Sequence, residues 1–175
     1  MTNLRTLLRI ATAEDHARLD ARAAQLDLGH SDGYIAFLCW HARVLPKLEA
    51  QLGINPELPD WPDRIRTPAL LADLAVLRIA PPAPLPPPSL VSRAERIGAL
   101  YVLEGARLGA TMLARRVGLA QPLAPRSFLT HGADARLWPR FLAWLEVLHV
   151  AESAIPGMVA GARATFAAYL QTLSD

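Results

Sequence analysis

The chain has 175 residues, of which 52% are hydrophobic and 19% charged; this suits one globular domain with a full core and excludes a disordered or collagen-like chain. Its 18 basic and 16 acidic residues leave a formal net charge of +2, and because the basic residues are scattered, the composition argues against nucleic acid as a partner. The single cysteine, Cys39, excludes an internal disulfide and any multi-cysteine metal site.

Apolar residues recur at helical spacing along most of the chain, and glycines and prolines interrupt the pattern. Six of the 15 prolines fall between residues 80 and 89, which predicts an extended connection there. No run of alternating β-branched residues predicts a strand. The sequence therefore predicts an all-α fold, a single domain over residues 1–175, with helices over residues 2–26, 31–52, 69–79, 90–117, 134–150 and 153–173.

No stretch approaches the roughly 18–20 uninterrupted apolar residues that span a bilayer. The first residues lead into a charged helical pattern without the hydrophobic segment of a secretory signal. We therefore expect a soluble, cytoplasmic protein with no membrane partner.

Three glycines share one face of the predicted helix over residues 90–117. Gly98, Gly105 and Gly109 lie seven and four residues apart, within about 40° of one another on a helical wheel. Each glycine inside a helix costs roughly 1 kcal/mol relative to alanine, so three on one face require an explanation. Two remain open: a close crossing with another helix, or a flat ligand lying against bare backbone.

His16 lies on the flank of the apolar stripe of the first predicted helix. Arg9, seven residues earlier, lies about 20° away on the same side. A lone helical histidine is usually a core or boundary residue with a satisfied hydrogen bond. The alternative is a metalloporphyrin site, in which imidazole binds the iron and arginine pairs with a propionate.

Three further candidates carry weaker signals. Glu146 and His149 form a Glu-x-x-His pattern, which is half of a carboxylate di-iron motif, but no second copy exists. Glu104 and Arg107 are expected to form an exposed ion pair worth only tenths of a kcal/mol. Cys39, between Leu38 and Trp40, is expected to be an unreactive core thiol.

Two segments resemble the bacterial heme oxygenases, above all the biliverdin-producing enzymes associated with bacteriophytochromes. The first is Thr-Ala-Glu-Asp-His-Ala-Arg-Leu over residues 12–19. The second is Tyr-Val-Leu-Glu-Gly-Ala-Arg-Leu-Gly-Ala over residues 101–110. Residues 34–49, 128–132 and 164–166 also fit, so the resemblance extends over nearly the whole chain.

The resemblance implies a heme oxygenase-like helical bundle that cleaves heme, its substrate and cofactor, with O2 and reductant to biliverdin, CO and Fe2+. It implies that His16 is the proximal iron ligand and that the distal face is helix backbone. The remaining implied site residues are Gly105, Gly109 and Ala110 on the distal helix, Arg9 and Tyr101 near the propionates, and Phe166 against the heme.

The implied partners are an electron donor, such as a ferredoxin or flavoprotein reductase, and a bacteriophytochrome that accepts the product. Ala106 replaces the serine or aspartate of many relatives, and Ala110 replaces a glycine in some. These departures motivate an alternative, a heme-binding or sensory protein on the same scaffold without oxygenase turnover. A third possibility replaces heme with two metals or another small ligand at Glu146 and His149.

Overall fold

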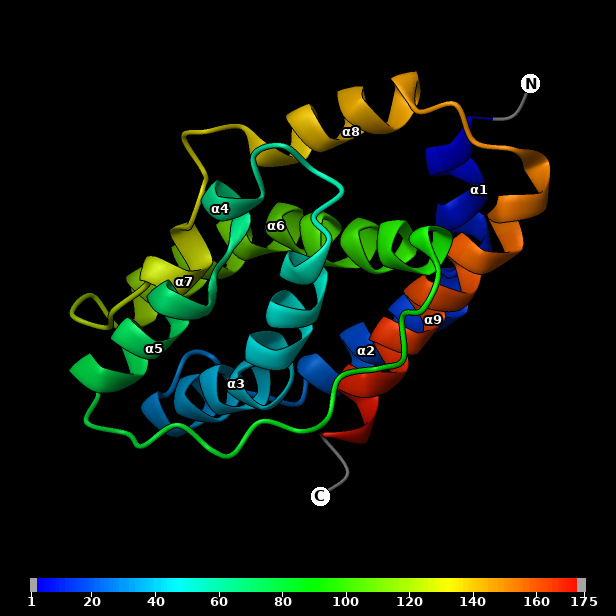
Figure 1. Cartoon of the computed structure of the whole chain (residues 1–175). Helices are drawn as coiled ribbons and strands as arrows, with labels where there is room; N and C mark the ends of the chain where they lie inside the picture. The colour runs from blue at the N-terminus through cyan, green and yellow to red at the C-terminus, as the bar shows by residue number, and fades with distance from the viewer. Residues whose placement is uncertain (1–2, 173–175) are drawn as a thin grey trace.

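The computed structural model describes residues 3–172, which form a bundle of helices with no strand within that range (Figure 1). The predicted all-α fold is confirmed. The elements are α1 (Leu4–Ala11), α2 (Ala13–Ala23), α3 (Ser31–Ile54), α4 (Trp61–Arg64), α5 (Thr67–Val76), α6 (Arg93–Ala120), α7 (Ser127–Thr130), α8 (Leu137–Val147), a 3-10 turn (Glu152–Ala154) and α9 (Ile155–Gln171).

The first predicted helix is interrupted at Thr12, so the prediction of one continuous helix is wrong there. Thr12 has φ −113° and ψ 9° and separates α1 from α2. Its buried hydroxyl donates to the carbonyl of Leu8 at 2.8 Å, a side-chain bond that competes with the regular helix ladder. Arg9 and His16 therefore lie on two different helices, so the angle of about 20° between them, which assumes one helix, does not apply.

Caps set the ends of α6 and α8. Helix α6 starts at Arg93, three residues later than predicted, because Ser92 and Glu95 form a reciprocal capping box. Gly118 does not stop it, and the helix runs to Ala120. Helix α8 is shorter than predicted, because Arg136 is left-handed at φ 50° and Leu148 is extended.

The remaining boundaries follow the sequence more closely. Helix α3 starts at Ser31 as predicted and runs two residues past the predicted end. The last predicted helix divides into the 3-10 turn and α9, and residue 173 lies outside the described range. The single-turn helices α4 and α7 were not predicted. The proline-rich stretch is extended as predicted, and Leu85 N–H fastens it to the carbonyl of Arg43 at 2.7 Å.

Helix α6 is the central element (Figure 1). It packs along α9 on one side and against α7 and α8 on the other, while α1 and α2 lie against α9. Among residues 3–172, α6 is the one helix with the length and hydropathy of a membrane span, but half of its apolar window is buried inside the protein. It therefore has the character of a core helix.

Candidate functional site

His16 lies on the outer surface of α2, a helix that buries none of its residues. Its side chain is 64% exposed, and Nδ1 lies 3.2 Å from an oxygen of Asp20, one turn later. The imidazole stands edge-on to Phe166, with ring centroids 6.0 Å apart. A carboxylate beside Nδ1 favours a proton on that nitrogen, which would leave the Nε2 lone pair to bind a metal.

Phe166 connects α2, α6 and α9. With Val102 and Ala162 it forms a small hydrophobic cluster, and Leu19 and Tyr101 pack against that cluster. Phe166 itself is buried. The cluster therefore brings the His16 face of α2 to α6 one turn before Gly105. His16, Tyr101 and Phe166, which the resemblance grouped, lie together.

The three glycines of α6 have two different surroundings. A Cβ at Gly98 would collide with the carbonyl oxygen of Met158 on α9, so this glycine permits the close crossing of the two helices. A Cβ at Gly105 would make ordinary contact with Trp138 at 3.8 Å, and one at Gly109 would meet nothing within 4 Å. The close crossing explains Gly98, whereas no crossing accounts for Gly105 or Gly109, where a ligand against the backbone stays a prediction.

Ala110 lies on a different side of α6 from Gly109. It is half-buried and packs against the main core, whereas Gly109 is exposed. Ala106, the other departure from the resemblance, is exposed. The open part of α6 thus presents the backbone at Gly105 and Gly109, without an ionisable side chain at either position.

Two exposed arginines of α1 lie near Tyr101. The Arg5 guanidinium carbon is 6.0 Å from the ring centroid of Trp138, within cation–π range. Burial raises the pKa of Tyr101, and the charges of Arg5 and Arg9 oppose this shift without cancelling it. Tyr101 therefore stays protonated near neutral pH and can donate a hydrogen bond. Arg9 is exposed, as a residue that meets a carboxylate at a site's edge would be.

Glu104 and Arg107 form part of a buried ionic cluster, so the prediction of a weak exposed pair is wrong. Glu104 is 2% exposed and accepts from Arg107 Nε at 2.9 Å and from Arg64 Nη1 at 2.5 Å. Arg64 also pairs with Asp60 at 2.7 Å. Arg107 Nη2 donates to the carbonyl of Arg64, which ties α4 to α6. The cluster fixes the turn of α6 directly before Gly105.

The di-metal possibility loses its structural basis. Helix α8 ends at Val147, so Glu146 and His149 are not on one helix, and both are exposed. Within the described part of the chain, no group of three or more His, Cys, Asp or Glu side chains is placed to hold a metal. Cys39 is half-buried, and burial raises the pKa of its thiol, in line with the predicted unreactive role.

Sequence reasoning missed several residues around this site. Asp20 had a usable signal, since a carboxylate four residues after a helical histidine is within reach of its ring. Trp138 and Arg5 had none, because their contacts with α6 and with each other join distant parts of the chain. Arg64 was missed for the same reason, because its partner Glu104 lies 40 residues away.

Comparisons with known proteins identify a family through a sequence relative and a fold through a solved structure. No protein-family model matches the chain. It is 38% identical over 150 residues to a heme oxygenase of Xanthomonas campestris pv. campestris (strain 8004), a match that covers 81% of this chain and 90% of that protein. It also matches the solved structure of NO- and CO-bound heme oxygenase from Neisseria meningitidis, with a TM-score of 0.85 and 22% identity, over 99% of this chain and 91% of the other. The structural likeness shows the fold, and the sequence relative shows the family.

Proposed function

This chain belongs to the heme oxygenase family, and from that premise we propose that heme binds between α2 and α6 with the imidazole of His16 as its iron ligand. The enzyme cleaves heme, which is its substrate and cofactor, to biliverdin, carbon monoxide and iron. The role that each residue has in heme cleavage is proposed from the geometry described above. We take residues 1–175 to act as one heme oxygenase-like domain.

The observation that carries the proposal is the pairing of an exposed, oriented histidine with an open stretch of helix backbone. His16 is held by Asp20 through Nδ1, which leaves Nε2 free. Gly109 has no atom within 4 Å of where a Cβ would be. Phe166 connects the two helices that carry these features. This combination suits a flat ligand bound at its centre on one side and packed against backbone on the other.

Bound heme supplies the iron at which O2 is reduced. The protein's own part begins with orientation, because Asp20, 3.2 Å from Nδ1 of His16, would favour a proton on that nitrogen and turn Nε2 towards heme. Phe166 restricts the ring's rotation through its edge-on contact. Together they set the side and the depth at which heme sits.

The heme propionates would meet the basic side of the site. Arg9 is exposed on α1, and Tyr101 keeps its phenol proton because burial raises its pKa. We propose a charge-assisted bond from Arg9 to one carboxylate and a hydrogen bond from Tyr101. Arg5, beside Trp138, adds a second positive charge there.

On the opposite side of heme, we propose that the backbone at Gly105 and Gly109 orders water, whereas Ala110, which the resemblance grouped with them, packs against the main core. Neither Ala106 nor Ala110 supplies an acidic or hydroxyl group, so proton delivery depends on water held by main-chain groups. Gly105 and Gly109 carry no ionisable side chain, so this face would offer a bound heme only main-chain groups and the water that they hold.

The remaining partners are proposals from the family. The reaction needs electrons, which we assign to a ferredoxin or flavoprotein reductase, and the product suits a bacteriophytochrome as acceptor. We place the enzyme in the cytoplasm.

His16→Ala tests the iron ligand. We expect the histidine-ligated heme spectrum to disappear and hemin affinity to fall by far more than the roughly 10–100-fold effect expected of Asp20→Asn, which removes only the orienting carboxylate. Added imidazole should restore the spectrum. Hemin titration with resonance Raman spectroscopy measures these changes.

The matched control is His30→Ala. His30 is 81% exposed and pairs through Nδ1 with Asp27 at 2.7 Å, so it is a second exposed histidine beside an aspartate, placed before α3 and away from Phe166. We expect this variant to keep the wild-type spectrum. A wild-type iron–histidine signature in His16→Ala would overturn the ligand assignment.

A further inference from the structure

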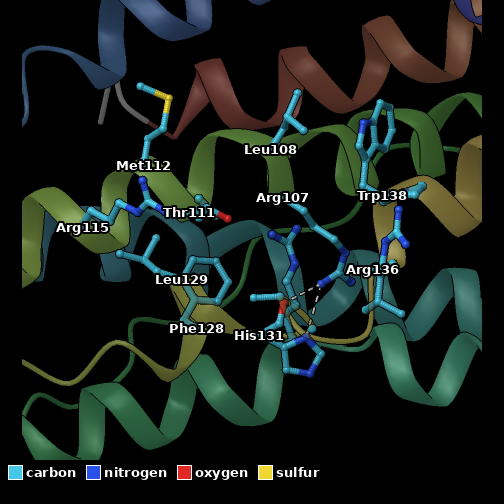
Figure 2. A pocket seen from close by; sticks show the side chains of 16 residues that line it. Arg107, Leu108, Thr111, Met112, Arg115, Phe128, Leu129, His131, Arg136 and Trp138 are labelled. Carbon is cyan, nitrogen blue, oxygen red and sulfur yellow. Dashed lines mark hydrogen bonds between the residues drawn. The ribbon is translucent and has the colours of Figure 1, made fainter.

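A cavity of about 390 Å3 lies beside the C-terminal half of α6 (Figure 2). Its walls come from α6, α7, the loop before α8 and the first turn of α8. The lining includes none of His16, Phe166 or Gly109. It does include Ala110, on the core side of α6, and Trp138, which also lies against Gly105. The volume is at the lower end of the roughly 300–1,000 Å3 typical of small-molecule sites.

The lining is strongly positive. It contains no Asp or Glu side chain, and one of its arginines, Arg107, is neutralised by Glu104 from behind the wall. The four arginines of the lining are Arg66, Arg107, Arg115 and Arg136.

The guanidinium groups of the other three arginines form no ion pair in the described part of the chain, although the backbone N–H of Arg66 donates to the carboxylate of Glu49 at 2.9 Å. Arg66 is 3% exposed, donates to the carbonyl of Leu103 at 3.3 Å and stacks over Phe128 at 5.4 Å. No carboxylate of residues 3–172 lies within ion-pair distance of Arg66, Arg115 or Arg136. Three guanidinium groups around one cavity therefore favour an anion there.

Arg136 reaches the cavity from strained backbone. Its φ of 50° lies in the left-handed region, which a residue with a Cβ seldom adopts, and it is the residue before α8. Figure 2 shows Arg136 and Arg115 towards opposite ends of the cavity, with the Arg107–His131 contact between them. Strain of this kind concentrates where a side chain must be aimed at a ligand.

His131 adds a neutral donor to the lining. Its Nδ1 lies 3.3 Å from Arg107 Nη1, and because arginine only donates, Nδ1 accepts and the proton is on Nε2. Burial and the nearby Arg107 and Arg66 charges lower the pKa of His131, which keeps the ring neutral at pH 7.

The rest of the wall is apolar. Leu108 and Met112 are 62% and 74% exposed, unusually high for large apolar side chains, and Phe128 and Leu129 lie in the same wall. A ligand matched to this surface carries one negative group and an apolar body. We propose that the cavity binds a small organic carboxylate with an apolar ring or chain at a site separate from heme. Its negative group would be bound by an arginine at one end of the cavity, Arg136 or Arg115, and attracted by the charge of the other.

Benzoate labelled with 13C at its carboxyl carbon tests this, with the heme-free and the hemin-loaded full chain followed by NMR. We expect saturable one-to-one binding to both forms, and none of the neutral analogue benzyl alcohol. Arg136→Gln and Arg115→Gln should each weaken benzoate binding. The effect should be about tenfold for the arginine that donates to the carboxylate, the loss of one charge-assisted hydrogen bond, and smaller for the other, which acts through its charge alone. Both residues are exposed, so the variants are expected to fold.

Arg18→Gln, an exposed arginine of α2 outside the cavity lining, is the control and should bind benzoate like the wild type. Absence of saturable binding, or equal affinity in all three variants, would overturn the proposal. Loss of binding after hemin loading would assign these arginines to a carboxylate of heme itself and would overturn the separate site. The heme-free arm does not depend on the function proposed above, so the two can fail independently.

Discussion

Replacing Glu104 with glutamine is expected to destabilise the protein by about 3–5 kcal/mol, the cost of removing one partner from a buried ionic cluster. Glu104 neutralises Arg64 and Arg107, which are 1% and 8% exposed. Without the Glu104 charge, Arg107 forms no ion pair with a carboxylate of residues 3–172, and Arg64 pairs only with Asp60. Since a domain is stable by only about 5–15 kcal/mol, the loss is large. Urea unfolding of the heme-free protein measures it.

Glu57→Gln is the matched control. Glu57 also pairs with two arginines, Arg93 and Arg96, but these are 57% and 18% exposed. Glu57 itself is 10% exposed, but because Arg93 lies largely in water, we expect a smaller cost than at Glu104, about 1–2 kcal/mol. If the two variants lost equal stability, the buried cluster would not be what holds α4 against α6.

The second large effect separates Gly98 from Gly109. Gly98→Ala is expected to destabilise the protein by about 3 kcal/mol, the upper end of overpacking costs, because the new methyl collides with the Met158 backbone. Gly109→Ala meets no atom within 4 Å and should stabilise the heme-free helix by up to about 1 kcal/mol. The same methyl would intrude on the proposed heme position, so hemin affinity should fall.

Urea unfolding and hemin titration on both variants check this pair of predictions. Gly109→Ala is expected to be more stable than wild type without heme yet weaker in hemin binding. A Gly109→Ala variant that binds hemin like wild type would place the heme elsewhere on the protein.

The all-α fold could be predicted because helical periodicity and proline punctuation are local. The failures at helix ends came from side-chain bonds that the pattern does not encode. Thr12 interrupts the first helix through a bond to Leu8, and Ser92 with Glu95 sets the start of α6. The helical wheel placed Gly98, Gly105 and Gly109 on one face. It could not show that α9 crosses α6 at Gly98, that Trp138 lies beside Gly105, or that the surface at Gly109 is open, because these neighbours come from distant parts of the chain.

The candidate site was predicted from the resemblance more than from chemistry. His16, Tyr101 and Phe166 lie together, as it implied. Charge partners were harder to find, because a pair's strength depends on burial and on residues far away in sequence. The sequence indicated a weak surface pair of Glu104 and Arg107, whereas in the structure both are buried and Arg64 also pairs with Glu104. The cationic cavity had no sequence signal, since its arginines are spread over 71 positions, from Arg66 to Arg136.

An absorbance titration with hemin, followed by ascorbate in air with catalase present, tests the central claim that this protein cleaves heme held by His16. We expect a saturable one-to-one Soret band that gives way to the absorption of biliverdin in the wild type. A Soret band that persists under these conditions would mean a heme-binding protein without turnover. Absence of a saturable band would mean that the fold is present without its ligand.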